Sequence, residues 1–195
     1  MDRRVSSRHP SRGITMLELL VVLTVMGLLA VIGLPAFLNT VRKGKMQTTI
    51  RETTTMLRAA RLQAIKESQP IGIERQKSQR RIIAYEENDG TDGFGVGGTD
   101  EIIESVILPN RITFAAPGTQ SEVDGFDNND WFVYEPNGSA THSGAFRFGD
   151  PRGNYLEVRV EPAATGRVDV RMWQNFGGTD KWMSQGQEDH SWDWN

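Results

Sequence analysis

The sequence predicts an α+β fold in which a long N-terminal helix packs, by its second half, on a small antiparallel β-sandwich. Three observations lead to this prediction: an apolar run near the N-terminus, a helical stripe of apolar residues after it, and then only short segments with strand patterns. The chain has 195 residues, of which 37% are hydrophobic, so one small core beside an apolar anchor is the expected organisation.

A basic leader, residues 1–13, precedes the apolar run. Its charged residues are Arg3, Arg4, Arg8 and Arg12 against a single acidic residue, Asp2. Because basic residues tend to stay on the cytoplasmic side of a membrane, we expect a cytoplasmic N-terminus and a C-terminal domain outside the cytoplasm. An ordinary signal peptide carries its cleavage site in small residues after the apolar run, and residues 33–37 offer no such site.

Residues 14–38 form the predicted transmembrane helix. The run 19–34 is short for the ~20 residues that cross a bilayer, but apolar residues on both sides extend it. Gly27, Gly33 and Pro35 suit a membrane helix better than a soluble one, since small residues allow close packing and proline is tolerated there. We expect a helix that packs and bends; the alternative is a signal anchor that packs against nothing.

Glu18 is the lone carboxylate in this segment. A charged side chain at the centre of a membrane helix costs about 2.5–3.5 kcal/mol on insertion scales, so a partner charge or a function is needed to explain it. The alternative is an interfacial glutamate whose side chain reaches the lipid headgroups.

The leader that ends in Gly13, the apolar Ile14 after it and the following Glu18 resemble the N-terminal motif of the type IV pilin and pseudopilin class. The resemblance implies that a prepilin peptidase cuts between Gly13 and Ile14 and that Ile14 is then N-methylated. Such chains usually begin with Phe or Met, so Ile14 departs from the pattern. Pro35 lies where these proteins often carry a proline, which implies a part in assembly.

The same resemblance gives Glu18 a role in filament assembly. Cleavage would create a positive amine at Ile14, and this amine, or that of a neighbouring subunit, can pair with the Glu18 carboxylate. Removing one partner of a buried ion pair typically costs about 3–5 kcal/mol. Loss of the leader also lowers the net charge from −3 to −6, so the mature chain would be acidic.

Residues 39–69 are the predicted amphipathic continuation of the helix. Its apolar stripe recurs at steps of three or four residues: Met46, Ile50, Thr53, Leu57, Ala60 and Ala64. Pro70 is the expected stop, so one helix should run from Ile14 to about Glu67, on the order of 80 Å at ~1.5 Å per residue. A small core needs far less, so half of the helix should contact membrane or other subunits.

Residues 70–172 carry the signals of a β domain. The strands are expected at 71–73, 80–85, 102–108, 131–134, 145–148, 156–160 and 168–171. In the last two, apolar and charged residues alternate, which predicts half-buried strands. The Asn137-Gly138 turn and the segment 163–168 resemble the domain of H-type minor pseudopilins, the GspH/FimT family.

That resemblance implies a structural subunit of a type II secretion pseudopilus, with other pseudopilins or pilins and an inner-membrane assembly platform as partners. It implies a single-pass protein of the bacterial inner membrane with a periplasmic C-terminal domain. The alternative is a minor pilin of a type IV pilus, which serves pilus assembly, adhesion or DNA uptake.

DNA uptake by FimT-type relatives uses basic residues in a Gly-Arg-x-Arg pattern. Here Arg167 follows Gly166, but Asp169 replaces the second arginine and Arg171 comes two positions later. Arg147, Arg152 and Arg159 are further candidates for a basic patch. An acidic mature chain repels phosphates, so nucleic acid is not an expected partner.

Other local patterns favour loops over sites. The glycines of residues 93–98 match dinucleotide spacing, but a predicted strand follows where such a site needs a helix. Acidic clusters at 86–100 and 124–130 match no EF-hand, so solvated loops are expected, with calcium as the alternative. Ser139, His142 and Ser143 fit a turn better than a catalytic set, so we expect no enzyme and no cofactor. The absence of cysteine excludes disulfides.

Residues 173–195 form a predicted tail beyond the domain. It holds four of the five tryptophans: Trp173, Trp182, Trp192 and Trp194. Tryptophan is favoured at interface hot spots, so the tail either docks on a neighbouring subunit or secreted cargo, or folds back over its own sandwich.

Overall fold

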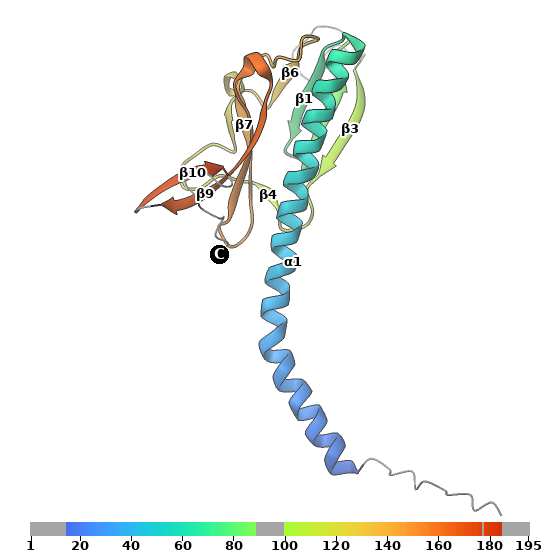
Figure 1. The fold of residues 1–195 in the computed structure, drawn as a ribbon, viewed down its shortest axis with the longest axis vertical. Helices are drawn as coiled ribbons and strands as arrows, with labels where there is room; N and C mark the ends of the chain where they lie inside the picture. Colours follow the sequence, from blue (N-terminus) through green and yellow to red (C-terminus); the bar gives the residue numbers. More distant parts are fainter. Residues whose placement is uncertain (1–14, 89–99, 177, 185–195) are drawn as a thin grey trace, which may run out of the picture. The chain divides into compact units, whose positions relative to one another are not determined.

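The computed structural model describes residues 15–88, 100–176 and 178–184 (Figure 1). Within these residues, one helix, α1 (Met16–Glu67), is followed by ten strands. The strands are β1 (Ile71–Gln76), β2 (Arg81–Glu86), β3 (Glu101–Ile107), β4 (Thr113–Phe114), β5 (Val123–Gly125), β6 (Trp131–Tyr134), β7 (Gly144–Gly149), β8 (Tyr155–Val160), β9 (Val168–Phe176) and β10 (Thr179–Ser184). Two short 3-10 turns, η1 (Phe126–Asn128) and η2 (Ala163–Thr165), lie between strands. The chain divides into two compact units, Met1–Arg42 and Lys43–Asn195.

In the first unit, α1 exposes its apolar side chains. Its most apolar stretch has a mean hydropathy of 2.6 and is not buried at all, so by length and composition α1 can cross a membrane. The helix continues through Pro35. Such a surface is unfavourable in water, because each exposed apolar side chain forgoes the gain of burial.

In the second unit, the apolar stripe predicted for α1 is confirmed. Its members Met46, Ile50, Thr53, Leu57, Ala60 and Ala64 are all buried. Two buried threonines bond within the helix, since the Thr49 and Thr53 hydroxyls donate to the carbonyl oxygens four residues earlier at 3.0 and 2.9 Å. The helix ends at Glu67, before Pro70, as the sequence predicts.

The strands form two antiparallel sheets. Sheet A has the order β3-β2-β1-β6, and sheet B has the order β10-β9-β8-β7-β4 with β5 paired to β7. The registers set Ile73 opposite Ala84 in sheet A and Val158 opposite Val170 in sheet B. The predicted α+β fold, a long helix packed on antiparallel sheets, is confirmed.

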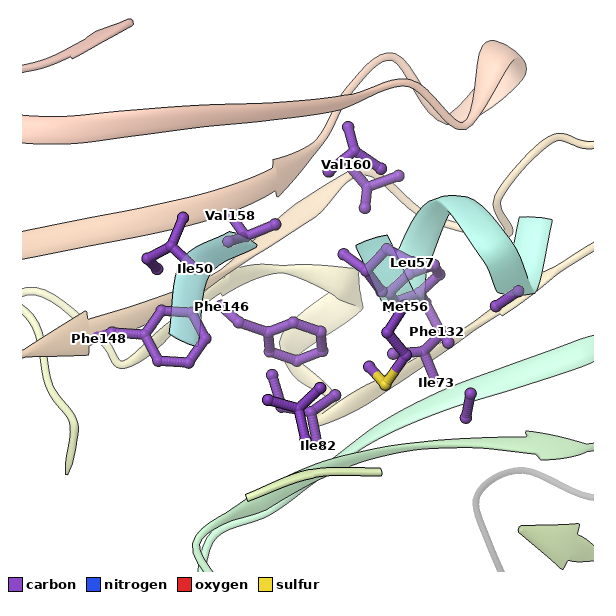
Figure 2. Packing of buried hydrophobic residues seen from close by; sticks show 14 of the residues in the cluster. Ile50, Met56, Leu57, Ile73, Ile82, Phe132, Phe146, Phe148, Val158 and Val160 are labelled. Atoms are coloured by element: carbon purple, nitrogen blue, oxygen red, sulfur yellow. The ribbon is translucent and has the colours of Figure 1, made fainter. Parts of the chain in front are cut away.

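One core joins α1 to both sheets (Figure 2). Phe132 of β6 contacts three other aromatic rings in this core. Its ring centroid lies 4.6 Å from that of Phe126, in a stacked pair, 5.0 Å from that of Tyr134, in an edge-on pair, and 6.2 Å from that of Phe146. Leu57 of α1 belongs to the same buried cluster. Aromatic pairs in such offset or edge-on geometries add about 0.5–1.5 kcal/mol beyond the burial of their area.

Sheet B extends further than the sequence predicts. The domain was expected to end at residue 172, whereas β9 continues to Phe176 and pairs with β10, so that Met183 lies buried opposite Met172. Residues 173–184 mix tryptophan with amide and charged side chains, so they show no clean alternation, and the pairing with the rest of β9 decides their structure. Trp192 and Trp194 lie outside the described residues.

Candidate functional site

Glu18 lies in the first turn of α1 with an exposed side chain. Thr15 caps this turn, since its Oγ1 accepts the backbone N–H of Glu18 at 3.2 Å. A carboxylate here also interacts favourably with the positive end of the helix dipole. Gly13 and Ile14 lie outside the described residues, so their cleavage stays a prediction, and Pro35 lies within the helix without ending it.

A network of ion pairs occupies the face of sheet B that is opposite to its core-facing side chains. It consists of Asp124, Arg147, Glu157, Arg159, Glu161, Asp169 and Arg171, and is called the sheet B network below. Glu157 accepts from Arg147 Nε at 3.0 Å and from Arg159 Nε at 2.9 Å. Asp124 pairs with the same two arginines. Two carboxylates and two guanidiniums thus hold β5, β7 and β8 together.

The prediction that β8 is half-buried is wrong. Glu157 is fully buried, and the Arg147 and Arg159 side chains are only 6% and 14% exposed. The guanidinium of Arg147 lies 5.0 Å from the ring of Trp182, which comes from β10, so this hairpin helps to cover the charged face. Alternation alone cannot show such a cover, since it comes from a later segment of the chain.

The tryptophans of the β9–β10 hairpin contact their own domain. Trp173 and Trp182 meet edge-on with ring centroids 5.3 Å apart. The indole N–H of Trp182 donates to Oε1 of Gln120 at 3.0 Å, which ties the hairpin to the loop before β5. For Trp182, on which Trp173 packs, the alternative of folding back over the sandwich therefore describes the structure.

Burial and charge act in opposite directions on Asp124. Burial by itself raises the pKa of this carboxyl, but the hydrogen bond from Arg159 and the positive charges of Arg147 and Arg159 outweigh it and hold the pKa below its usual range. The same pairings with Glu157 and Asp124 raise the pKa of the Arg159 guanidinium despite its burial.

The domain should therefore lose stability in acid through Asp124. A carboxyl with a lowered pKa in the folded state stabilises above its unfolded pKa of about 3.9, and this contribution is lost as pH falls through the folded pKa. Asp124→Asn should flatten the fall in thermal midpoint between pH 6 and pH 3. Asp127→Asn is the control, because Asp127 is exposed. Equal slopes for wild type and Asp124→Asn would contradict the assignment.

The predicted basic patch is mostly neutralised within the chain. Arg147 and Arg159 are bound to Glu157 and Asp124, and Arg171 pairs with Asp169 at 3.1 Å. Arg152 and Arg167 are exposed, and their side chains form no ion pair among the described residues. This pairing weakens any attraction for phosphates.

Two members of the acidic cluster 124–130, Asp124 and Asp130, are likewise paired with arginines. Asp130 binds Arg75 at 2.6 Å, and Arg75 also binds Glu122 at 2.5 Å. Lys77 joins Glu122 at 2.8 Å. Within the described ranges no group of three or more histidine, cysteine or acidic side chains is placed to hold a metal ion. Of the other acidic cluster, residues 89–99 lie outside those ranges, together with the glycine-rich segment 93–98.

The serines near His142 belong to turns. The Ser139 hydroxyl donates to Oδ1 of Asn137 at 2.6 Å, and Oγ of Ser143 accepts the backbone N–H of Ala163 at 2.8 Å. The first bond lies in the turn between β6 and β7, as expected for small polar residues, and the second ties this connection to η2.

Two grooves that the sequence does not reveal flank α1 in the second unit. The first, of about 350 Å³, lies between α1 and sheet B and is called the arginine groove below; it is lined by Gln47, Ile50, Arg51, Thr54, Thr55, Arg58, Leu156 and Val170. The second, of about 470 Å³, lies between α1 and β3 and is lined by Arg51, Glu52, Thr55, Glu104, Ser105, Val106 and Ile107. Both arise where segments distant in sequence meet, so no local pattern predicts them.

Two family models match the chain. Residues 8–34 match the prokaryotic N-terminal methylation motif, and residues 49–166 match the type II transport protein GspH. Two crystal forms of the type IV minor pilin FimU from Pseudomonas aeruginosa (strain PAO1) are similar in structure, each at 12% sequence identity. The first has a TM-score of 0.45 over 69% of this chain and 96% of that chain, and the second 0.38 over 73% and 90%. No curated protein sequence matches.

Proposed function

Because this chain belongs to the GspH family and begins with a prepilin-type methylation motif, we propose that it is an H-type minor pseudopilin of a type II secretion system. The observation that carries the proposal is the methylation motif at residues 8–34, which runs into a helix whose apolar side chains are exposed. The family model supports it over more than half of the chain.

The exposed half of α1 supports a role in assembly. Its side chains include Leu23, Leu29 and Ile32, which are 60%, 64% and 76% exposed. A surface of this size needs lipid before assembly and other helices after it. In the proposed filament, Glu18 pairs with the new amine at Ile14 of a neighbouring subunit.

In this proposal the chain works by assembly and force transmission, without catalysis. A prepilin peptidase removes residues 1–13 in the inner membrane, and the N-terminus then faces the cytoplasm while the C-terminal domain lies in the periplasm. The further partners are other pseudopilins and the inner-membrane assembly platform.

The test is the intact mass of the protein purified from membranes of its native host, compared with a Gly13→Leu variant. We expect the wild type to lack residues 1–13 and to carry one added methyl group on Ile14. Gly13→Leu should keep the leader, because the peptidase needs the small residue before the cut. If both proteins keep the leader, the pilin-like pathway is excluded.

A second experiment distinguishes a type II secretion system from a type IV pilus. Deletion of the gene should abolish the export of enzymes into the medium and leave twitching motility intact. Complementation with the wild type should restore export, whereas Gly13→Leu should not. Loss of motility with normal export would instead assign the chain to a type IV pilus.

A further inference from the structure

The arginine groove combines an apolar floor with two exposed arginines. Its floor contains Ile50, Leu156 and Val170. Its charged lining residues are Arg51 and Arg58, both exposed. Unlike the arginines of the sheet B network, neither forms an ion pair with another described residue. Such a surface suits an acidic segment that also carries apolar side chains.

An open strand edge adjoins this groove. Strand β10 ends at Ser184, which lies opposite Arg171. On that side of β9, residues 168–170 therefore have no partner strand within the described part of the chain, although β8 pairs with them on the other side. Val170 both belongs to this open edge and lines the arginine groove. One extended segment can thus pair with the open edge of β9 as an additional strand and, at the same time, reach the arginine groove.

We propose that the arginine groove is the binding site for residues 185–195 of the same chain. These residues begin directly after Ser184, so continuation of the β10 register brings the first of them opposite Val170. They carry Glu188, Asp189 and Asp193 with no lysine or arginine, and they include Trp192 and Trp194. Their charge complements Arg51 and Arg58, and their tryptophans match the apolar floor.

The reach of the segment is sufficient. Eleven extended residues cover about 35 Å, whereas the stretch of α1 that lines the groove, residues 47–58, rises by about 17 Å. The second groove fits this occupant less well, because Glu52 and Glu104 place negative charge beside Arg51 there. Docking in the arginine groove would also cover an edge that otherwise invites pairing with other chains.

The test uses the full chain in detergent, a chain ended after Ser184, and a labelled synthetic peptide of residues 185–195, with binding read by fluorescence anisotropy. The shortened chain should bind the peptide at least ~10-fold more tightly than the full chain, because a tethered segment competes at a millimolar effective concentration. Arg58→Glu in the shortened chain should weaken binding by about tenfold or more. Arg152→Glu, an exposed arginine outside the groove, is the matched control and should change nothing.

Three outcomes would overturn the proposal. One is no peptide binding by the shortened chain, and another is equal binding by the full and shortened chains, which would point to an acidic segment of another subunit. The third is binding that Arg58→Glu leaves unchanged.

A second measurement needs no truncation. The chain has no cysteine, so Thr55→Cys with Ser191→Cys in the full chain can be joined by a short bis-maleimide. We expect an intramolecular product for this pair and none for Arg152→Cys with Ser191→Cys. Equal yields for the two pairs would also reject the proposed site.

Discussion

Replacing Glu157 by alanine should lower the free energy of unfolding by about 3–5 kcal/mol, which is comparable to the total stability of many small domains. Glu157 is fully buried and accepts from Arg147 and Arg159. Alanine would leave both guanidiniums with Asp124 as their shared partner in a covered site. The penalty comes from uncompensated buried charge, more than from the net strength of the original pairs.

The measurement is urea unfolding of the full chain in detergent, followed by tryptophan fluorescence. Glu161→Ala is the matched control, because Glu161 is a glutamate of the same network whose side chain is 48% exposed, and its loss should change stability by about 1 kcal/mol or less. A further variant, Glu157→Leu with Arg147→Met, should recover part of the loss, since it removes charge on both sides. Similar effects for Glu157→Ala and Glu161→Ala would contradict the role of burial.

Replacing Phe132 by alanine should also cost about 3–5 kcal/mol. Its ring is fully buried and contacts Phe126, Tyr134 and Phe146, so the change removes apolar burial, leaves a cavity and breaks three aromatic contacts. The neighbouring Trp131 gives a local probe. In Phe132→Ala its indole ring should become exposed to solvent, and its emission should shift, at a lower urea concentration than in the wild type.

The control for Phe132 is Leu62→Ala. Leu62 lies in α1 and is 65% exposed, so its truncation should change stability by less than about 1 kcal/mol. If Phe132→Ala unfolds at the same urea concentration as the wild type, the aromatic cluster does not contribute as we describe. Both large effects concern the second unit, whereas Gly13 and Ile14 belong to the first, so folding and processing can be separated experimentally.

Local periodicity explains why much of the fold could be predicted. The buried face of α1 follows from the spacing of Met46, Ile50 and Leu57, because side chains three or four apart share one side of a helix. The strands that contain Val158 and Val170 follow from the alternation of apolar and charged residues, whereas the pairing of these two residues comes from the structure. The end of the helix before Pro70 could also be predicted, because a proline disfavours the helical backbone conformation of the residue that precedes it.

The sheet B network could not be predicted in the same way. Arg147, Glu157 and Arg159 carry an alternating charge signal, yet alternation with polar residues normally marks a solvent-facing side. Strand β10, with Trp182 over Arg147, helps to turn that side into a covered one. The β9–β10 hairpin itself shows no regular alternation of apolar and polar residues, because tryptophan, amide and charged side chains are mixed along both strands.

The sequence by itself determined the prepilin-type leader, the lone Glu18 in an apolar helix and the order of the helix and most strands, but not β4, β5 and β10. These features depend on residues that are adjacent or one helical turn apart. The tertiary structure alone decided which charges are buried and where the arginine groove lies. Arg159 meets Asp124 across 35 positions of sequence, and Arg61 donates to the carbonyl oxygen of Gly138 across 77. Such contacts depend on how whole helices and strands pack. Desolvation and charge pairing act between groups that are close in space, so the residues next to Arg159 or Arg61 in the sequence do not predict these partners.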